Sequence, residues 1–588
     1  MPSRYLLLLV FLFTMCASVP KQTTTKLPRV EDLSLDEKVG QMFVHAGHGY
    51  FSGDSGWRYR DILRQVETNR IGGFIWFQSN VFETAWLTQK AQAASKIPML
   101  ISADLEAGIG MRFLDTTYWP TAMAVGATGD PKLAEEQGRI TAREAKVLGI
   151  NHIYAPVADV NVDPANPVIN ARSYGEDPEA VGRFVAAFIR GVQSEGVLAT
   201  AKHFPGHGDT HTDSHRSLPV LSVDRTRLDQ VELVPFRAAV AAGVASVMIG
   251  HLAVPALDKT PVPIRDHAES THENPYATPS AEVTLDGSVP ATLSRVIIEG
   301  LLRNELGFRG LIVSDAMDMG GLVAHYTAGE AAIQGILAGQ DQILKSPNTD
   351  AAVLAVKEAV RSGRISEARI DQSVRRILDA KGKVGFAVGS MDEIFRTIDR
   401  KEHRAVATDI ARRALTLLRE EPGVLPLRKD ARVMILSVSD FDEVANPLPD
   451  FARETASRLT MKPSVFLLDS RSPEEDAAPV LEAAQNTDIV ILALGIRARS
   501  GAGHMLLPDV AKRAIAAFPP NVKRIAIAFG SPYILQSVPT LPTYIAAYGP
   551  QPVLQVAAAA AIFGEAPITG RLPVTIPGFY SRGSGLTR

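Results

Sequence analysis

The sequence predicts an α/β protein in which a TIM (β/α)8-type barrel is followed by a second, open α/β sandwich domain. Eight short apolar runs alternate with helical patterns between about residue 35 and about residue 390. A further set of β-rich runs follows a long charged helical stretch. A chain of 588 residues is too long for one hydrophobic core, so two or more domains are expected.

The predicted barrel spans residues 30–390. Its eight candidate strands are VGQMFVHAG, IGGFIWFQ, PMLISADLE, NHIYAPVADV, VLATAKHFPG, SVMIGHLAVP, GLIVSDAM and DQILKS. Most of these runs are apolar throughout and do not alternate between apolar and polar residues, which is typical of parallel strands covered on both faces. Between them lie helical patterns such as PKLAEEQGRITAREAKVLG. Eight β-α units in about 350 residues predict a closed barrel.

The remaining segments differ in character. Residues 259–289 are polar and rich in Pro, Ser and Thr, which predicts a surface insertion between the sixth and seventh units, either a lid or a plain loop. Residues 391–414 are expected to form a linker helix, and its helical pattern continues through TLLR, residues 416–419. Residues 415–588 are expected to form the C-terminal α/β domain, and its loops carry no Gly-rich phosphate fingerprint.

The N-terminus predicts export. Residues 1–20 hold one arginine and an apolar run that is short for a membrane span and suits a secretory signal. We expect a periplasmic or extracellular protein with no later membrane span. Lipid anchoring through Cys16 stays open, although Met15 fits such a signal poorly. Because Cys16 is the single cysteine, a chain that loses this segment has no disulfide and no cysteine metal site.

The composition is that of an ordinary globular protein, with 46% hydrophobic and 21% charged residues. The formal net charge of −3 and the lack of a strong basic stripe argue against a nucleic-acid partner.

Residues 202–215, KHFPGHGDTHTDSH, contain four histidines spaced by four. Such histidines share a face only in a helix, and Pro205, Gly206 and Gly208 disfavour one, so we expect no metal site. The segment ends the fifth predicted strand, where barrel enzymes carry their chemistry. Asp213, two residues before His215, can orient the imidazole for general acid/base catalysis. A solvated loop with an Asx turn is the alternative.

Charged residues follow other strand ends. Asp315 ends the apolar seventh strand and could act as a nucleophile or an electrostatic stabiliser. Its alternative role is a helix N-cap, for which Asp318 is the better candidate. The third strand end offers Asp104, Glu106 and Arg112, and the fourth offers Asp159, Asp163 and Arg172. Several acids and a few cations at one barrel mouth suit a polyhydroxylated ligand.

Five stretches together resemble glycoside hydrolase family 3, and more closely its β-N-acetylglucosaminidase branch in the long two-domain form. They are DLEAGIGMRF, NPVINARSYGEDP, KHFPGHGDTHTDSH, GHLAVPALD with PATLS, and LLRNELGFRGLIVSDAMDM. The resemblance implies a retaining mechanism through a covalent glycosyl-enzyme. It makes Asp315 the nucleophile, His215 the acid/base and Asp213 the partner of His215.

The resemblance also implies that five residues bind the hydroxyl and acetamido groups of the terminal sugar: Asp104, Arg112, Arg172, Lys202 and His203. His207 would shape the loop, and His211 receives no role. Ala107 stands where the family usually has a glycine, and for this reason Glu106 is left out of the expected site. No cofactor is implied. The expected partner is a carbohydrate substrate, such as a muropeptide of cell-wall peptidoglycan or a chitin fragment, and the protein is a monomer or a homodimer.

Other functions stay open at this point. A β-glucosidase or β-xylosidase of the same family would usually take a glutamate as its acid, which the DSH sequence argues against. A β-N-acetylglucosaminide phosphorylase would use phosphate in place of water. A non-enzymatic glycan-binding protein is disfavoured by the intact Asp315, Asp213 and His215, and a metal-dependent hydrolase would be inactivated by a chelator.

Overall fold

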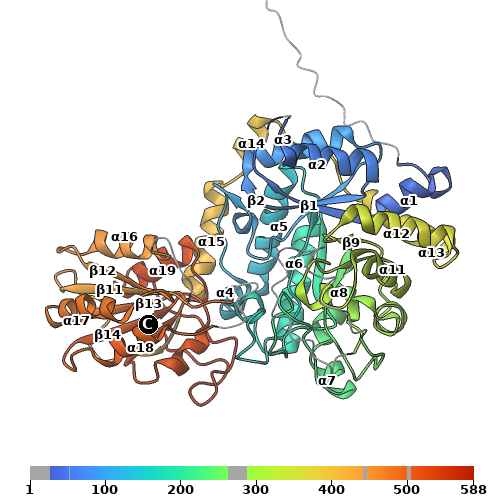
Figure 1. The fold of residues 1–588 in the computed structure, drawn as a ribbon. Coiled ribbons are helices and arrows are strands. Elements are labelled where there is room, and N and C mark those ends of the chain that lie inside the picture. Colours follow the sequence, from blue (N-terminus) through green and yellow to red (C-terminus); the bar gives the residue numbers. More distant parts are fainter. Residues whose placement is uncertain (1–26, 52, 54, 263–287, 441–445, 499–504) are drawn as a thin grey trace, which may run out of the picture.

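The structure is a computed structural model that describes residues 27–51, 53, 55–262, 288–440, 446–498 and 505–588. The predicted signal segment with Cys16 and most of the predicted insertion 259–289 lie outside these residues. Figure 1 shows two lobes, with the C-terminal residues in orange and red on the left and the N-terminal residues on the right.

The N-terminal lobe is a parallel barrel, which confirms the predicted fold class. Its strands are β1 (Phe43–Gly49), β2 (Gly73–Asn80), β3 (Leu100–Ala103), β5 (His152–Ile153), β6 (Leu198–Phe204), β7 (Ser246–Ile249), β8 (Leu311–Ser314) and β9 (Ile343–Leu344). They pair in this order, and β9 also pairs with β1. A bridge between Val313 and Gln342 joins β8 to the start of β9 and closes the ring. Each of the eight predicted runs overlaps one of these strands.

Helices surround the barrel, as expected when parallel strands are covered on both faces. Asp130 and Asp177 cap the N-termini of α5 and α6, and each helix has proline in its first turn. The connecting helical segments are α2 (Trp57–Arg64), α3 (Val81–Ala94), α5 (Pro131–Val147), α6 (Pro178–Ser194), α8 (Val234–Ala241), the π-helix Val296–Glu305, α11 (Ala328–Ala338), α12 (Thr349–Arg361) and α13 (Glu367–Lys381).

Three expectations need correction. The run that begins at Val39 starts inside a helix, α1 (Leu35–Gln41), and becomes a strand only at Phe43. The linker 391–414 is two helices, α14 (Met391–Thr397) and α15 (Lys401–Ala414). The sequence TLLR, which continues the helical pattern of α15, is instead the strand β10 (Thr416–Arg419), because it pairs with β15.

The C-terminal lobe is a six-stranded sheet of order β10-β15-β14-β13-β11-β12, parallel except for β10. Its other strands are β11 (Val433–Val438), β12 (Ser464–Leu468), β13 (Ile489–Leu494), β14 (Lys523–Ala528) and β15 (Thr543–Ala546). In Figure 1, α16 (Pro449–Arg458) and α19 (Pro552–Ile562) lie above the sheet, and α17 (Ala477–Gln485) and α18 (Asp509–Ala516) lie below it. The contacts agree, since α16 packs on α19 and α17 packs on α18.

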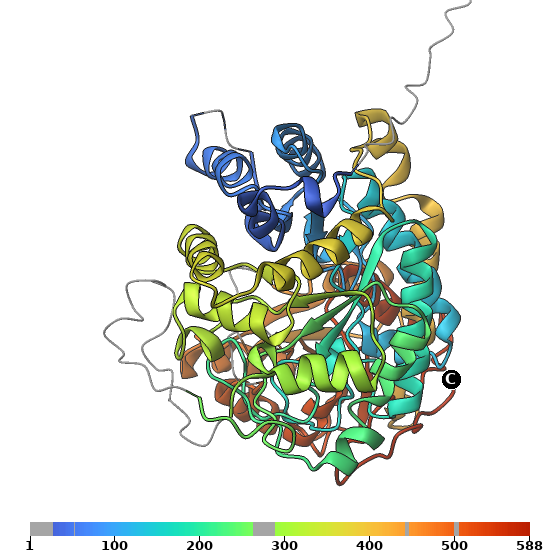
Figure 2. The ribbon, with the colours of Figure 1, turned by 90° about the vertical axis from the view of Figure 1, so that its right-hand side faces the viewer.

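The two lobes share part of their hydrophobic cores. Met123 and Ala124 of helix α4 (Ala122–Ala127) belong to the barrel sequence but are buried in the core of the C-terminal domain. The hydroxyl of Thr121 donates to the carbonyl of Tyr548 at 3.1 Å. Figure 2 shows the barrel in front of the C-terminal domain. These contacts hold the two domains against each other.

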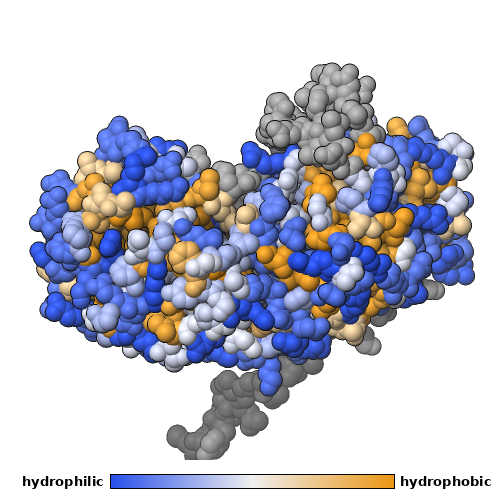
Figure 3. All heavy atoms as spheres, turned by 90° about the horizontal axis from the view of Figure 1, so that it is seen from below, coloured by the Kyte–Doolittle hydropathy of each residue, from blue (hydrophilic) through white to orange (hydrophobic). Residues whose placement is uncertain are grey.

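The surface shown in Figure 3 mixes hydrophobic and hydrophilic residues over both lobes. Among the described residues, no helix has the length and apolar character needed to cross a membrane.

Candidate active site

A cavity of about 770 Å³ lies at the carboxyl ends of the barrel strands. Asp104, Lys202 and Asp315, from the ends of β3, β6 and β8, contribute to its wall. The loops that follow β13, β14 and β15 contribute Arg497, Gly530, Tyr548, Pro550 and Gln551. Both sheets therefore present their carboxyl edges to one cavity, the edge at which α/β folds bind ligands.

Asp315 follows the last residue of β8 and lines the cavity. Its backbone N–H donates to the carbonyl of Ile249 in β7 at 2.9 Å, and its Oδ1 accepts the N–H of Ala316 at 2.8 Å. Burial alone would raise the pKa of Asp315, but the neighbouring His203 and His251 and the Ala316 N–H outweigh burial and lower it. Asp315 is therefore ionised at neutral pH, as a carboxylate nucleophile must be.

His215 and Asp213 form a pair on the loop after β6. Nδ1 of His215 lies 2.8 Å from Oδ1 of Asp213, and the same oxygen accepts the backbone N–H of His215 at 2.9 Å. The Asp213 side chain is fully buried, whereas the His215 side chain is 34% exposed and lines the cavity. A carboxylate only accepts hydrogen bonds, so Nδ1 carries a hydrogen and Nε2 is left to exchange protons with a ligand.

His203 is held by a buried carboxylate that was outside the expected site. Asp159 has no exposed surface and lies 2.8 Å from Nδ1 of His203. It also accepts the backbone N–H groups of His203 and His207. Nε2 of His203 lies 3.5 Å from Nη2 of Arg172. Asp159 thus fixes both the ring and the start of the loop that carries His215.

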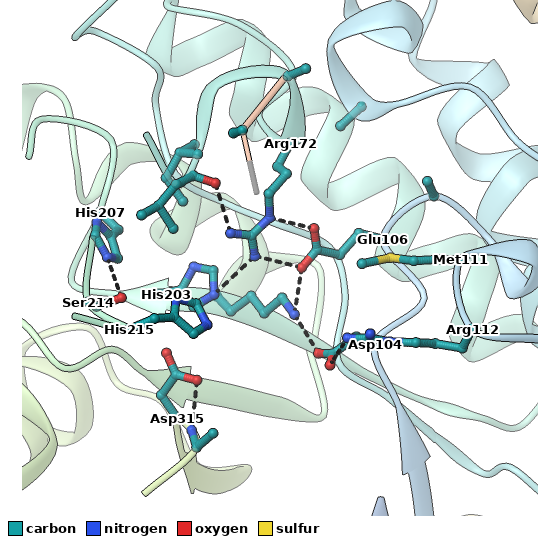
Figure 4. A pocket seen from close by; sticks show the side chains of 18 of the residues that line it. Asp104, Glu106, Met111, Arg112, Arg172, His203, His207, Ser214, His215 and Asp315 are labelled. Carbon is teal, nitrogen blue, oxygen red and sulfur yellow. Dashed lines mark hydrogen bonds and ion pairs between the residues drawn. The ribbon is translucent and has the colours of Figure 1, made fainter. Parts of the chain in front are cut away.

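Two carboxylates and three cations interlock on the other side of the cavity (Figure 4). Lys202 Nζ lies 2.8 Å from both Asp104 Oδ1 and Glu106 Oε1, and its side chain is only 3% exposed. Arg172 binds Glu106 through two hydrogen bonds of 2.8 Å. Arg112 binds the second oxygen of Asp104 at 2.6 Å. These pairs make a rigid set of charged donors and acceptors.

The charges in this cluster stabilise one another. Burial would raise the pKa of Asp104, but Lys202 and Arg112 outweigh burial and lower it to about 2. The pKa of Glu106 is also lowered well below its usual value, because Arg172 and Lys202 outweigh burial. Burial would lower the pKa of Lys202, yet Asp104 and Glu106 raise it. All of these groups therefore stay charged across the neutral range.

The other two histidines of the loop differ in their surroundings, and His207 also lines the cavity. His207 is buried between the hydroxyls of Thr210 and Ser214, at 2.7 and 3.1 Å, and burial lowers its pKa to about 4. His211 is 80% exposed and pairs with Asp163. Among the described residues, no group of three His, Cys, Asp or Glu side chains is arranged to hold a metal ion.

The structure brings the expected residues together in this cavity. Seven of them line it, namely Asp104, Arg112, Arg172, Lys202, His203, His215 and Asp315, and Asp213 lies directly behind His215. Asp318 is not a helix cap, since Met319 occupies that position in α10 (Gly320–Val323) and Asp318 pairs with Lys345 at 2.7 Å.

Sequence reasoning left out three supporting residues. Glu106 lines the cavity despite Ala107, and Asp159 supports His203. His251 places Nε2 2.9 Å from the carbonyl of Ala316 and Nδ1 2.7 Å from the hydroxyl of Thr292, so it supports the loop behind Asp315. Glu106 and Asp159 stand among the charged residues that the sequence places at strand ends, but nothing in the sequence indicates which side chain each one contacts.

Residues 34–380 match the glycosyl hydrolase family 3 N-terminal domain. The chain belongs to this family. A beta-N-acetylglucosaminidase/beta-glucosidase from Cellulomonas fimi is 29% identical over 555 residues, which cover 92% of this chain and 94% of that protein.

Two solved structures align with nearly the whole chain. A glycoside hydrolase family 3 beta-N-acetylglucosaminidase from Paenibacillus sp. str. FPU-7 is 33% identical, with a TM-score of 0.79, covering 92% of this chain and 99% of that one. The beta-glucoside phosphorylase BglX bound to 2FGlc is 26% identical, with a TM-score of 0.78, covering 93% of this chain and 95% of that one. The family 3 protein described here is a glycosidase of the β-N-acetylhexosaminidase type.

Proposed function

We propose that this family 3 glycosidase is a retaining, exo-acting enzyme that removes terminal β-linked N-acetylglucosamine from muropeptides or chitooligosaccharides. The observation that carries the proposal is the His215–Asp213 pair, which faces the same cavity as the ionised Asp315. We further propose that residues 1–20 direct export, so that the substrate lies in the periplasm or outside the cell.

In the first step, Asp315 attacks the anomeric carbon of the terminal sugar. Protonated His215 gives its Nε2 proton to the departing glycosidic oxygen, and Asp213 stabilises the imidazolium from the Nδ1 side. The bond to the leaving sugar breaks as the ester to Asp315 forms.

In the second step, His215 is neutral and takes a proton from an incoming water. The hydroxide attacks the anomeric carbon and releases Asp315, so that two inversions at this carbon retain its configuration. One histidine thus serves as acid and then as base, the double role that most retaining glycosidases give to a carboxyl group.

The charged cluster of Asp104, Lys202 and Arg172 is suited to hold the hydroxyl and acetamido groups of the terminal sugar. It offers fixed donors and acceptors in a closed corner of the cavity. Pre-arranged groups of this kind lose little entropy when a ligand binds, which favours a defined sugar orientation.

The deciding experiment compares hydrolysis of an aryl β-N-acetylglucosaminide with that of the matching β-glucoside, with and without Asp315→Asn. We expect strong preference for the acetamido sugar and loss of activity in the variant. Preference for the glucoside would keep Asp315 as nucleophile and overturn the proposed specificity. Activity unaffected by Asp315→Asn would overturn the mechanism.

A phosphorylase is the second candidate, favoured by the fold shared with the beta-glucoside phosphorylase BglX. In that reaction phosphate would attack the glycosyl-enzyme and the product would be a sugar 1-phosphate. Turnover that rises with phosphate concentration, together with formation of this product, would show that the enzyme is a phosphorylase and not a hydrolase. Turnover independent of phosphate would exclude it.

A further inference from the structure

An exposed aromatic patch lies at the rim of the barrel, on the side of β1 and β2. Several of its side chains are largely open to solvent, with Phe51 65%, Trp57 69% and Phe82 51% exposed. Exposed apolar side chains are unremarkable singly, but a contiguous group marks an interaction surface. The group, called the rim patch below, consists of Tyr50, Phe51, Trp57, Tyr59, Phe82, Trp86 and Leu114.

Ring contacts connect the centre of the rim patch, and Trp57 begins α2, two residues before Tyr59. The ring centroid of Trp86 lies 5.9 Å from that of Phe51 and 5.5 Å from that of Tyr59. Phe82 lies one helical turn before Trp86 on α3, so both share a face. Leu114 pairs with Asn80, the residue that caps α3. In Figure 1, α2 and α3 lie side by side above β1 and β2.

A row of rings joins the rim patch to the cavity. The ring of His48 is stacked on Tyr50 at 6.3 Å with an interplanar angle of 8°. The centroid of the same His48 ring lies 6.0 Å from that of Phe77, which is part of the cavity wall. Arg112 and Lys345, which also line the cavity, lie over the Phe77 ring at 5.1 and 5.0 Å. The patch is therefore continuous with the proposed substrate pocket.

We propose that the rim patch binds further sugar units of a β-linked N-acetylglucosamine chain whose terminal unit occupies the cavity; this inference rests on the proposed function. A pyranose ring presents a face of C–H groups, which pack on the electron-rich face of an aromatic ring. Its hydroxyls lie at the ring edge, within reach of polar groups. Arg58 and Lys90, which lie over the rings of Trp57 and Trp86 at 5.1 and 5.7 Å, supply hydrogen-bond donors within the patch.

The connection to the cavity also distinguishes between occupants. If the rim patch were inserted into a lipid surface, the membrane would cover the row of rings that leads into the cavity and would hinder substrate entry. A glycan chain instead has to pass the rim of the cavity whenever its end is bound. The patch would then give the enzyme higher affinity for long chains than for single sugars.

Tryptophan fluorescence reports on this surface directly. The chain has four tryptophans, of which Trp76 and Trp119 have no exposed surface, so the exposed Trp57 and the partly exposed Trp86 respond to a ligand on the rim patch. We expect a six-unit chitooligosaccharide to change the emission of the Asp315→Asn protein, and free N-acetylglucosamine to leave it unchanged. Phe51→Ala and Trp57→Phe should alter or weaken this response. A change of emission that is the same for the six-unit chain and for free N-acetylglucosamine would overturn the proposal.

Steady-state kinetics give the second test. In the active enzyme, Phe51→Ala and Trp57→Ala should raise KM for the six-unit chain about ten-fold and leave the aryl monosaccharide substrate unchanged. Phe395→Ala is the matched control, because Phe395 is 78% exposed on the linker helix α14. Equal changes of KM for the six-unit chain and the aryl substrate would contradict the proposal, and so would an equal effect of Phe395→Ala. The proposal would also be wrong if the rim variants kept the KM of the wild type and lost only binding to lipid vesicles or self-association.

The two proposals fail in different ways. A wild-type enzyme that binds the long chain but does not cleave the aryl N-acetylglucosaminide would overturn the proposed function while the rim patch remained a glycan-binding surface. An enzyme that cleaves this substrate but whose KM is the same for every chain length would keep the function and overturn the rim patch.

Discussion

The Nδ1 atom of His215 lies 2.8 Å from Oδ1 of Asp213, whose side chain has no exposed surface. This single contact sets which ring nitrogen faces the cavity and places a negative charge behind the ring. A histidine held in this way can donate a proton and take one back without turning its ring. The pair should therefore matter most for substrates whose leaving group needs protonation.

We expect His215→Ala to slow cleavage of chitobiose by about 10²–10⁴-fold, the usual contribution of general acid/base catalysis. An aryl glycoside with a good leaving group needs little protonation and should lose much less in its first step. Asp213→Asn should show the same pattern with a smaller loss, because the ring remains but loses its carboxylate.

The matched control for this pair is His211→Ala, since His211 is in the same loop but is 80% exposed. It should leave both rates close to those of the wild type. Equal losses on chitobiose and on the aryl glycoside in the His215 variant would contradict the acid role.

Glu106→Gln tests the charged cluster. The variant keeps the shape of the side chain but removes the negative charge that Lys202 and Arg172 both contact, so that Lys202 keeps Asp104 as its carboxylate partner. Because Glu106 helps to raise the pKa of Lys202, its loss lowers that pKa and brings the alkaline fall of kcat/KM to lower pH. We expect KM to rise about ten-fold with a smaller effect on kcat.

Glu135→Gln is the control for this variant, because Glu135 pairs with Arg190 on the surface and both side chains are about half exposed. A pH profile of Glu106→Gln that coincides with that of the wild type would show that Glu106 does not act through Lys202.

A chain that ends at residue 390 tests whether the barrel is independent. Met123 and Ala124 have no exposed surface in the whole protein, and both would lose the C-terminal core that covers them. We expect the shortened protein to be poorly soluble and to bind a hydrophobic dye, since newly exposed apolar surface promotes aggregation. A soluble, active fragment would show that the C-terminal wall of the cavity is dispensable.

Much of the barrel was predictable, because strands buried on both faces leave continuous apolar runs in the sequence. Asp104, Lys202 and Asp315 were found for the same reason, since a charge directly after such a run stands out. The strand β10 was missed, because TLLR continues the helical pattern of α15 and becomes a strand only through its pairing with β15. Pairing partners far apart in the chain leave no local signal.

The support of the site could not be predicted for a similar reason. The role of Asp159 depends on the ring of His203, 44 positions later, and that of Glu106 on Arg172, 66 positions later. The part of the cavity wall formed by Tyr548, Pro550 and Gln551 depends on how the two domains pack. There, Tyr548 has a φ of +64°, and a Cβ on Gly549 would collide with the side-chain oxygen of Gln551. These are consequences of the tertiary structure.

Lys381, at the end of α13, predicts how stability depends on pH. Its side chain has no exposed surface and its Nζ donates to Oε1 of Gln41 at 2.5 Å, and burial lowers its pKa to about 7. In the unfolded chain the pKa is about 10.4, so between these values the unfolded chain binds more protons than the folded one. Stability should therefore rise with pH in this window, by up to about 1.4 kcal/mol per pH unit.

The measurement is urea denaturation of the wild type and of Lys381→Met at pH 6, 7, 8 and 9. We expect the variant to be the more stable protein at pH 6 and 7, because it does not bury a charge, and its advantage to shrink towards pH 9 as the native lysine becomes neutral. Lys383→Met is the control, since Lys383 is exposed two residues further on and should leave the pH dependence unchanged. If the two proteins showed the same dependence of stability on pH, Lys381 would have an ordinary pKa in the folded protein. The cause would then be water that reaches its amino group or a local opening of the structure around Gln41.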